Sequence, residues 1–301
     1  MNPTATETSA DRPSSTSAAT VVGCILTRNE ERNITKALAS LLAATDAVVV
    51  VDSESDDRTR EIASSMGATV LVHAFESYPD QRNWALDQIA AQFGEVWVLS
   101  LDADEWLTDE LAAEVRRRGP ELGRDADVYL LRRRTRFDGR VLRHGGFGTS
   151  WITRLFPVGL ARYEARKVNE HLDVPDGARI GRLDGWLEHA DVDSWSRYVD
   201  KHNRYSTLEA EARVAAGTAA PTITFGEARR DPAMRRRFLR ERVFNRLPAR
   251  PAVRFVQVFV VSRGFLDGRS GFRRALFEAW QEMMTDLKAE ELERNRRTSA
   301  R

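Results

Sequence analysis

The stretch VWVLSLDADEW, residues 96–106, decides the fold. Five of its first six residues are apolar, as expected for a strand buried on both faces. The run ends in closely spaced carboxylates, including Asp102 and Asp104, which repel one another and lose hydration. Mg²⁺ or Mn²⁺ would offset that cost, because hard cations prefer carboxylate oxygens and share them with nucleotide phosphates. Alternatively, Thr108 or Asp109 caps a helix whose dipole favours nearby acids. The stretch alone leaves both interpretations open.

The composition describes a globular protein with balanced charge. The chain has 301 residues, of which 42% are hydrophobic and 30% charged, and its formal net charge is +1. This length can hold one large domain or two small ones. The charge balance argues against a nucleic-acid binder, which usually has a basic excess. The single cysteine, Cys24, excludes a disulfide within the chain and fits a reducing cytosol. We expect it to be a small buried strand residue rather than a nucleophile.

Residues 1–20 are rich in Ser, Thr and Ala and lack an apolar segment behind a basic start. This composition predicts a disordered tail rather than a signal peptide. No run in the chain approaches the roughly 20 apolar residues that a membrane-spanning helix needs.

Strand and helix patterns alternate from Val21 to Arg118. The connections are short, which favours a parallel, doubly wound (Rossmann-like) α/β sheet. In such sheets, ligands bind beyond the carboxyl ends of the strands. The predicted strands are 21–26, 47–52, 69–73 and about 96–101, and the predicted helices are 34–43, 60–66 and 81–93.

Polar residues collect at three of these strand ends. No GxGxxG turn follows the first strand and no Walker lysine motif is present, so a dinucleotide fold and a P-loop are disfavoured. The pattern predicts a nucleotide-sized crevice with a metal, although each cluster alone is also ordinary turn and cap chemistry. The residues concerned are Thr27, Arg28, Asn29, Glu30, Asp52, Ser53, Ser55, Asp56, Asp102 and Asp104.

Several segments, in this order and spacing, resemble the family-two glycosyltransferases of the GT-A fold. The bacterial subgroup that includes lipopolysaccharide-core β-1,4-glucosyltransferases is the most similar, and the resemblance covers residues from about 21 to 290. The segments are TRNEERNITKALASL, AVVVVDSESDDRT, FESYPDQRNWAL, VLSLDADE, TRLFP, VNEHL, LEHAD and RGFLDGRSGFRRA.

The resemblance implies roles for individual residues at a nucleotide-sugar site. Asp102 and Asp104 form the DxD pair, with Asp104 the more direct ligand of Mg²⁺ or Mn²⁺. The metal holds the diphosphate and stabilises the leaving group. The implied nucleotide-sugar contacts are Thr27, Arg28, Asn29, Glu30, Asp52 (to the base), Ser53, Arg82 and Asn83.

An inverting transfer also needs a base that takes the proton of the acceptor hydroxyl. The candidate is Glu170 in KVNEHLDV, and its alternative role is an exposed strand carboxylate. The subgroup usually has a histidine where this chain has Asn169, which cannot carry a proton. His171 is a substitute, although on a strand it shares a face with Asn169. Asp184 and Asp267 are weaker candidates for the base.

Extended segments joined by turns are predicted over 127–190. Gly145, Gly146 and Gly148 make HGGFG either a flexible loop over the donor site or a turn that needs positive φ. Arg154 can pair with a phosphate or form a structural ion pair. The histidines expected to be structural or to support the site are His144 and His189. The tryptophans that can stack on a sugar or pack in the core are Trp151 and Trp186.

The last third of the chain changes character. Arginines alternate with apolar residues from Arg229 to Arg250, and the apolar run AVRFVQVFVV follows. This pattern is typical of an interfacial helix on anionic lipid headgroups, or of a solvated basic helix packed on the catalytic domain. Because such transferases often use lipid-linked acceptors, we expect residues 229–263 to contact an anionic membrane surface. Further helices are predicted over 194–216 and 272–295.

The sequence therefore predicts a GT-A-like catalytic domain over 21–192, with a nucleotide-sugar half (21–118) and an acceptor half (119–192). A helical, basic region over 193–301 follows. The expected activity is a cytoplasmic, metal-dependent, inverting transfer from a nucleotide-sugar, most plausibly a UDP-sugar, to a glycan or lipid-linked acceptor. The protein would lie peripherally on the inner face of the cytoplasmic membrane. A sugar nucleotidyltransferase and a non-catalytic membrane-surface protein are the alternatives.

Overall fold

The computed structural model describes residues 20–164, 172–192, 194–216 and 249–299. The chain divides into two compact units. Unit 1 runs to Ala103 and adds Leu107–Leu131 and Thr153–Gly185. Unit 2 contains Asp104–Trp106, Arg132–Ile152 and the chain from Trp186 onward. The described strands with residues in both units are β5 (Glu105–Leu107), β6 (Val128–Phe137), β8 (Thr149–Pro157) and β11 (Ile180–Ala190).

Unit 1 is built on a mixed sheet in the order β3-β2-β1-β4-β8-β6-β11. The neighbours β1–β2, β2–β3 and β1–β4 are parallel, and β8 runs antiparallel to β4. This confirms the predicted α/β sheet with its parallel N-terminal part. The parallel strands are β1 (Val21–Thr27), β2 (Ala47–Asp52), β3 (Thr69–Val72) and β4 (Trp97–Asp102).

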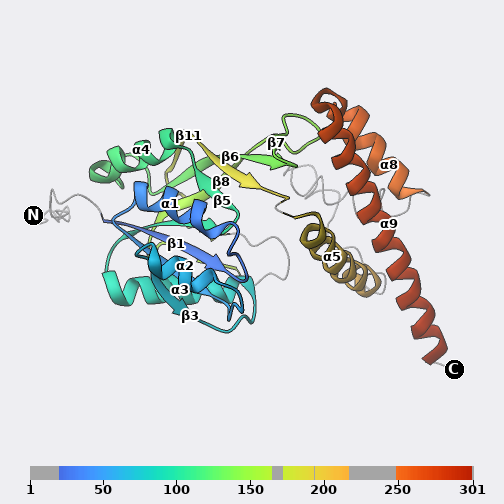
Figure 1. Ribbon diagram of the computed structural model, residues 1–301, viewed down its shortest axis with the longest axis horizontal. Coiled ribbons are helices and arrows are strands. Elements are labelled where there is room, and N and C mark those ends of the chain that lie inside the picture. Colours follow the sequence, from blue (N-terminus) through green and yellow to red (C-terminus); the bar gives the residue numbers. More distant parts are fainter. Residues whose placement is uncertain (1–19, 165–171, 193, 217–248, 300–301) are drawn as a thin grey trace, which may run out of the picture. The chain divides into compact units, whose positions relative to one another are not determined.

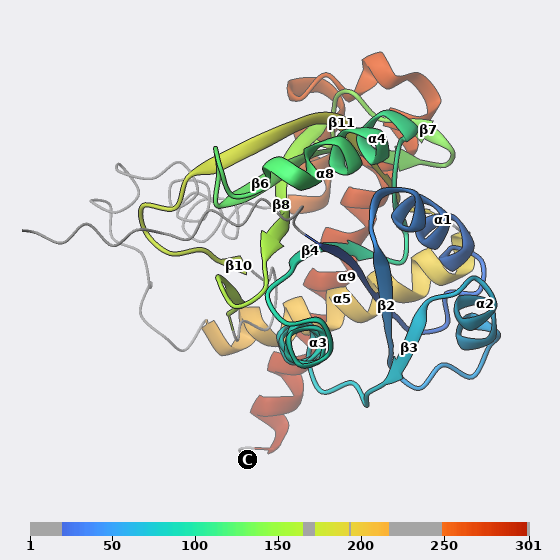
Figure 2. The same ribbon diagram turned by 90° about the vertical axis from the view of Figure 1, so that its left-hand side faces the viewer.

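Helices cover both faces of the parallel strands (Figure 2). Val22 and Cys24 on β1 belong to one core cluster with Ile89 of α3. At Gly23 on the opposite face, a Cβ would lie 3.0 Å from the side chain of Leu41 of α1, so glycine leaves room for the close approach of this helix. The helices of unit 1 are α1 (Ile34–Ala44), α2 (Thr59–Ser65), α3 (Tyr78–Phe93) and α4 (Asp109–Arg118), followed by the 3₁₀ turn η1 (Gly119–Glu121).

Two helix starts show what the sequence pattern conceals. Helix α3 begins at Tyr78 rather than Gln81, because Ser77 caps it by accepting from the backbone N–H of Asp80 at 3.3 Å. Helix α4 is capped by Thr108, so the helix-cap interpretation holds at that residue. The acidic residues that precede it belong to β4, to a turn and to β5 (Glu105–Leu107), not to the helix.

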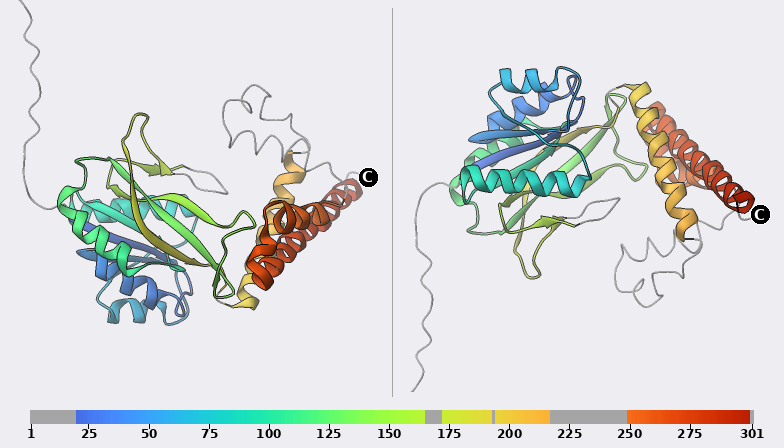
Figure 3. Two further views of the ribbon diagram at one scale, coloured as in Figure 1. Left: turned by 90° about the horizontal axis from the view of Figure 1, so that it is seen from above. Right: turned by 90° about the horizontal axis from the view of Figure 1, so that it is seen from below.

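Unit 2 contains the strand order β8-β6-β11-β5, with β7 (Arg140–Val141) paired to β6. Its helices are α5 (Trp195–Ala216), α8 (Arg250–Val256), the π-helical turn η3 (Gln257–Val261), the 3₁₀ turn η4 (Gly264–Asp267) and α9 (Gly268–Ser299). Helix α9 packs against both α5 and α8 (Figures 1 and 3). The last helix, α9, extends four residues beyond the predicted range 272–295 at each end.

Within the described ranges, none of the helices combines the length and apolar character required to cross a bilayer.

Candidate functional site

The strand register brings the predicted polar residues of unit 1 to one edge of the sheet. Thr27 pairs with Asp52 across β1 and β2, and Leu26 pairs with Asp102 across β1 and β4. All three strands are parallel, so their carboxyl ends meet there, where α/β sheets bind ligands.

Asp52 is a fully buried centre of hydrogen bonds at this edge. One carboxylate oxygen accepts from the Thr27 hydroxyl at 2.9 Å and the Ser55 hydroxyl at 2.5 Å, and the other accepts from the Ser55 backbone N–H at 2.8 Å. The Nε atom of Arg60 lies 3.6 Å from the Oδ1 atom of Asp52. The predicted contact residues Thr27 and Asp52 therefore bind each other and fix the loop after β2.

The loops after β1 and β2 are joined crosswise. The backbone N–H of Asn29 donates to the Ser55 hydroxyl at 2.8 Å, and the Asn29 side-chain oxygen accepts from the backbone of Asp56 at 2.9 Å. The Glu30 backbone donates to Thr59 at 2.8 Å. Asn29 has φ of 58°, a left-handed conformation that asparagine tolerates better than most residues.

Of the other predicted contacts at this edge, Arg28 is exposed, whereas Ser53 is buried. The Ser53 hydroxyl accepts from the side-chain amide of Gln81 at 3.0 Å. Gln81 also contacts His73 at 2.8 Å, so α3 is tied to the ends of β2 and β3. Gln81 cannot be singled out from the sequence, since an amide within an amphipathic helix carries no signal of its own.

Asp102, Arg82 and Arg154 form what we call the Asp102 centre. One Asp102 oxygen accepts from Arg82 at 2.6 Å and the other from Arg154 at 2.7 Å. Both arginine side chains are only 9% exposed, whereas the Asp102 side chain is 36% exposed. Burial alone would raise the pKa of Asp102, but Arg154 and Arg82 outweigh it and hold that pKa well below its usual range. Asp102 is therefore ionised at neutral pH, and Arg154 is in an ion pair.

Asp104 lies in unit 2, where its carboxylate is 3.4 Å from the Nε2 atom of His189 on β11. The backbone carbonyl of Asp104 accepts from Ala190 at 2.9 Å, which fixes this pairing. Burial would lower the pKa of His189, but Asp104, with help from Glu105, raises it. His189 therefore contacts a predicted site residue, as its predicted supporting role requires.

One or two accessible carboxylates are enough for a cation that arrives with its substrate. Among the described residues, no group of three or more His, Cys, Asp or Glu side chains could by itself hold a metal ion. Mg²⁺, however, is usually bound by one or two carboxylates together with substrate phosphates. Asp102, which is ionised and partly exposed, and Asp104 provide carboxylates of that kind.

Other predicted residues have structural partners. The Asn83 side chain forms two hydrogen bonds with the backbone of Tyr163, at 2.9 and 3.0 Å, and so holds β9 (Arg162–Tyr163). The Asp267 carboxylate accepts from the backbone N–H groups of Arg143 and His144. Asp184 is exposed, and its backbone binds Glu114 at 3.0 Å.

The segment HGGFG forms a turn with positive φ at Gly145 (72°) and Gly146 (85°). Gly148 is needed for a different reason, since a Cβ there would lie 2.9 Å from the carbonyl oxygen of Arg143. The candidate base Glu170, with Asn169 and His171, lies outside the described residues, as do 229–248 of the predicted membrane segment.

Cys24 is buried on β1, and burial raises the pKa of its thiol to about 12. The thiol is therefore protonated at neutral pH, which confirms the expected strand residue and excludes a reactive thiolate.

Comparison with known proteins extends these observations. The family model described as glycosyl transferase family 2 matches residues 24–180. An uncharacterized glycosyltransferase of Rickettsia prowazekii is 30% identical over 202 residues, which cover 64% of this chain and 68% of that protein. The lipopolysaccharide core biosynthesis glycosyltransferase LpsC of Rhizobium meliloti is 28% identical over 202 residues, or 64% and 71% of the two chains. Among solved structures, S. aureus TarS 1–349 in complex with UDP-GlcNAc aligns with a TM-score of 0.45 and 16% identity, over 92% of each chain.

Proposed function

Since the chain belongs to glycosyl transferase family 2 and is a glycosyltransferase, we propose that it moves a sugar from a UDP-sugar, with inversion, to a hydroxyl of a glycan or lipid-linked acceptor. The observation that carries the proposal is the Asp102 centre, an ionised carboxylate at the carboxyl edge of the parallel strands. The similarity to LpsC, a glycosyltransferase of lipopolysaccharide core biosynthesis, supports an acceptor of the cell envelope.

The Asp102 centre suits the diphosphate of such a donor. Its two guanidiniums and one carboxylate leave a net positive charge, and an anion beside Arg82 and Arg154 would meet donors that are already oriented. Buried, fixed cations need little reorganisation as negative charge develops on the leaving group. The residues that are proposed to shape the nucleotide site around this centre are Thr27, Arg28, Asn29, Glu30, Asp52, Ser53 and Asn83.

Asp104, with Asp102, is proposed to hold Mg²⁺ or Mn²⁺ when the donor binds. The bound cation would supply electrostatic stabilisation of the diphosphate. His189 would position Asp104, because its imidazole lies 3.4 Å from that carboxylate.

Glu170 is proposed as the base that accepts the proton of the attacking hydroxyl. The variant that tests this role is Glu170→Gln, which keeps the shape of the side chain but cannot take a proton. It should retain UDP-sugar binding while sugar transfer falls by roughly 10²-fold or more. Unchanged transfer would reject Glu170 as the base.

The direct test is release of UDP from a panel of UDP-sugars with Mn²⁺ and a lipid extract. Asp104→Ala should reduce that release by roughly 10³-fold and abolish Mn²⁺-dependent UDP binding. Asp176→Asn, a charge change in an exposed turn, is the control and should match wild type. If no UDP-sugar is consumed, or if Asp104→Ala behaves like the control, the proposed donor site is wrong.

A lipid-linked acceptor requires contact with the membrane, and we propose that the η3–η4 patch provides it. This patch consists of Val260, Val261, Phe265 and Leu266, which are between 48% and 72% exposed. Arg263, which lies among them, is also exposed. Exposed apolar side chains beside a cation are typical of a surface that binds anionic lipid. The protein would then lie on the cytoplasmic face of the membrane.

Flotation with vesicles of phosphatidylglycerol and phosphatidylcholine tests this contact. The double variant Val261→Asp, Phe265→Asp should float at least tenfold less than wild type, because each burial that it removes stabilises binding by about 1.5–3 kcal/mol. Leu208→Asp, which changes an exposed leucine on α5, is the matched control. Equal flotation of the double variant and the control would reject the patch.

A further inference from the structure

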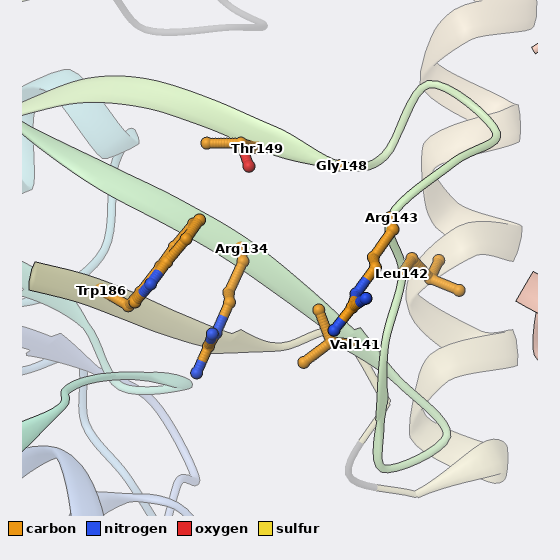
Figure 4. Close-up of a pocket in the computed structure, with 7 residues that line it drawn as sticks. All are labelled: Arg134, Val141, Leu142, Arg143, Gly148, Thr149 and Trp186. Carbon is orange, nitrogen blue, oxygen red and sulfur yellow. The ribbon is translucent and has the colours of Figure 1, made fainter.

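Unit 2 contains a pocket of about 310 Å³ that the proposed donor site does not use (Figure 4). It lies beside the strands β6, β7, β8 and β11, and its volume is at the lower end of the range for small-molecule sites. Its lining residues are Arg134, Val141, Leu142, Arg143, Gly148, Thr149 and Trp186.

The cationic character of this pocket follows from the period of a β-strand. Side chains two residues apart point to the same face, so Arg132, Arg134 and Arg136 share one face of β6. The guanidiniums of Arg132 and Arg134 lie 3.9 and 4.8 Å from the ring centroid of Trp186. Cation–π contacts of this kind hold the arginines in place without neutralising their charge.

One buried carboxylate offsets part of this charge. Glu188, 2% exposed, accepts from Arg134 and from Arg136 at 2.7 Å. Within the described chain, none of the pocket's lining residues is acidic. Arg143 is exposed, and its backbone rather than its side chain binds Asp267. The pocket is therefore pre-arranged for an anion.

We propose that this arginine pocket binds an anionic group, a phosphate or a carboxylate, carried by a sugar of the acceptor. Only the identification of the ligand as the acceptor rests on the proposed function. The binding of an anionic sugar does not depend on it. Arg134 and Arg143 supply charge-assisted donors, as Figure 4 shows them projecting beside Trp186 and Val141, and the Thr149 hydroxyl can bond a sugar hydroxyl. Val141 and Leu142 give the apolar wall that a free ion would not need.

The test is calorimetric titration of the full chain at low ionic strength, without UDP-sugar. The probes are glucose 6-phosphate, glucuronate, glucose and inorganic phosphate. At least one of the two anionic sugars should bind at least tenfold more tightly than both glucose and inorganic phosphate, and comparing glucose 6-phosphate with glucuronate tells the phosphate from the carboxylate.

Arg143→Gln should weaken that binding roughly tenfold, the loss expected for one charge-assisted contact. Arg140→Gln is the matched control, since Arg140 is an exposed arginine on β7 that does not line the pocket. UDP binding, measured on the same samples, should be equal in both variants.

Three results would overturn the inference: equal binding of glucose and the anionic sugars, binding of inorganic phosphate as tight as theirs, or equal effects of Arg143→Gln and Arg140→Gln. If the wild-type chain bound an anionic sugar but no UDP, the proposed donor site would be contradicted and the proposed pocket would not.

Discussion

Both units contain a carboxylate shared by two arginines, but the Asp102 centre of unit 1 and the Glu188 centre of unit 2, formed by Glu188, Arg134 and Arg136, bury opposite charges. In unit 1, Arg82 and Arg154 are 9% exposed and Asp102 is 36% exposed. In unit 2, Glu188 is 2% exposed, whereas Arg134 and Arg136 are 28% and 35% exposed. A carboxylate with two guanidiniums therefore presents an anion to solvent in unit 1 and cations to solvent in unit 2.

This difference shows why a count of ion pairs says little about function. The part of a centre that remains exposed decides which ligand can approach it. The Asp102 centre offers a carboxylate to a cation, with fixed arginines behind it, and the Glu188 centre offers guanidiniums to an anion. The cation proposed beside Asp102 and the anion proposed beside Arg134 complement the exposed groups, whereas the diphosphate would be held by the arginines behind Asp102.

The largest effect is expected from neutralising the exposed carboxylate of unit 1. Asp102→Asn leaves two buried guanidiniums without a counter-charge, and breaking a buried pair in this way costs about 3 kcal/mol or more. The free energy of unfolding, measured in urea, should fall by about that amount, and transfer activity should be lost. A loss below about 1 kcal/mol would show that water reaches the arginines and that the two centres do not differ as described.

Replacing the partner of Asp104 should have a smaller effect. His189→Gln keeps a hydrogen-bonding side chain but removes the imidazole, and changes beside a metal ligand typically cost 10- to 100-fold in metal affinity. We expect the Mn²⁺ concentration for half-maximal UDP-sugar turnover to rise roughly tenfold. An unchanged Mn²⁺ dependence would separate His189 from the proposed metal site. His202→Gln, on α5, is the control.

The smallest effect is expected from the buried carboxylate of unit 2. Glu188→Gln should cost only about 1 kcal/mol in the free energy of unfolding, because water can hydrate the partly exposed Arg134 and Arg136. A cost equal to that of Asp102→Asn would contradict the comparison.

The Glu188 pair should also depend on pH. Burial would raise the pKa of Glu188, but hydrogen bonds from Arg134 and Arg136 outweigh it, so the net pKa is lowered. A lowered pKa in the folded state means that the carboxylate stabilises the fold above its unfolded pKa of about 4.3 and stops doing so as pH falls. The difference between wild type and Glu188→Gln should therefore be full at pH 7 and shrink below about pH 4.

Much of unit 1 could be predicted because its strands are uniform apolar runs. Val48–Val51 are all buried, and the alternation of such runs with amphipathic helices specifies a parallel sheet. Helix α3 begins three residues before the predicted start, because its cap, Ser77, and Pro79 carry local backbone chemistry rather than periodicity. The sequence predicts the extended segment at the charged strand β6 correctly. It does not indicate that the partners of the β6 arginines lie on β11.

The candidate site was only partly visible in the sequence. Motif spacing found Asp102 and Asp104, whereas the pairs Asp102–Arg154 and Asp104–His189 join residues 52 and 85 positions apart along the chain. Such contacts depend on strand order, which a single sequence does not report. In this structure Arg154 forms an ion pair with Asp102, and its contact with a phosphate remains a proposal.

The crosswise bonds between the loops after β1 and β2 have a consequence for the thermodynamics of binding. Backbone groups of Asn29 and Asp56 are held by side chains of the opposite loop, and that of Glu30 by Thr59 at the start of α2, so these loops have already lost much of their conformational freedom. Ordering a loop on binding normally subtracts from affinity. At this edge that entropy is lost during folding instead, so a nucleotide would meet a rigid surface, and its binding should leave the amide exchange rates of both loops almost unchanged.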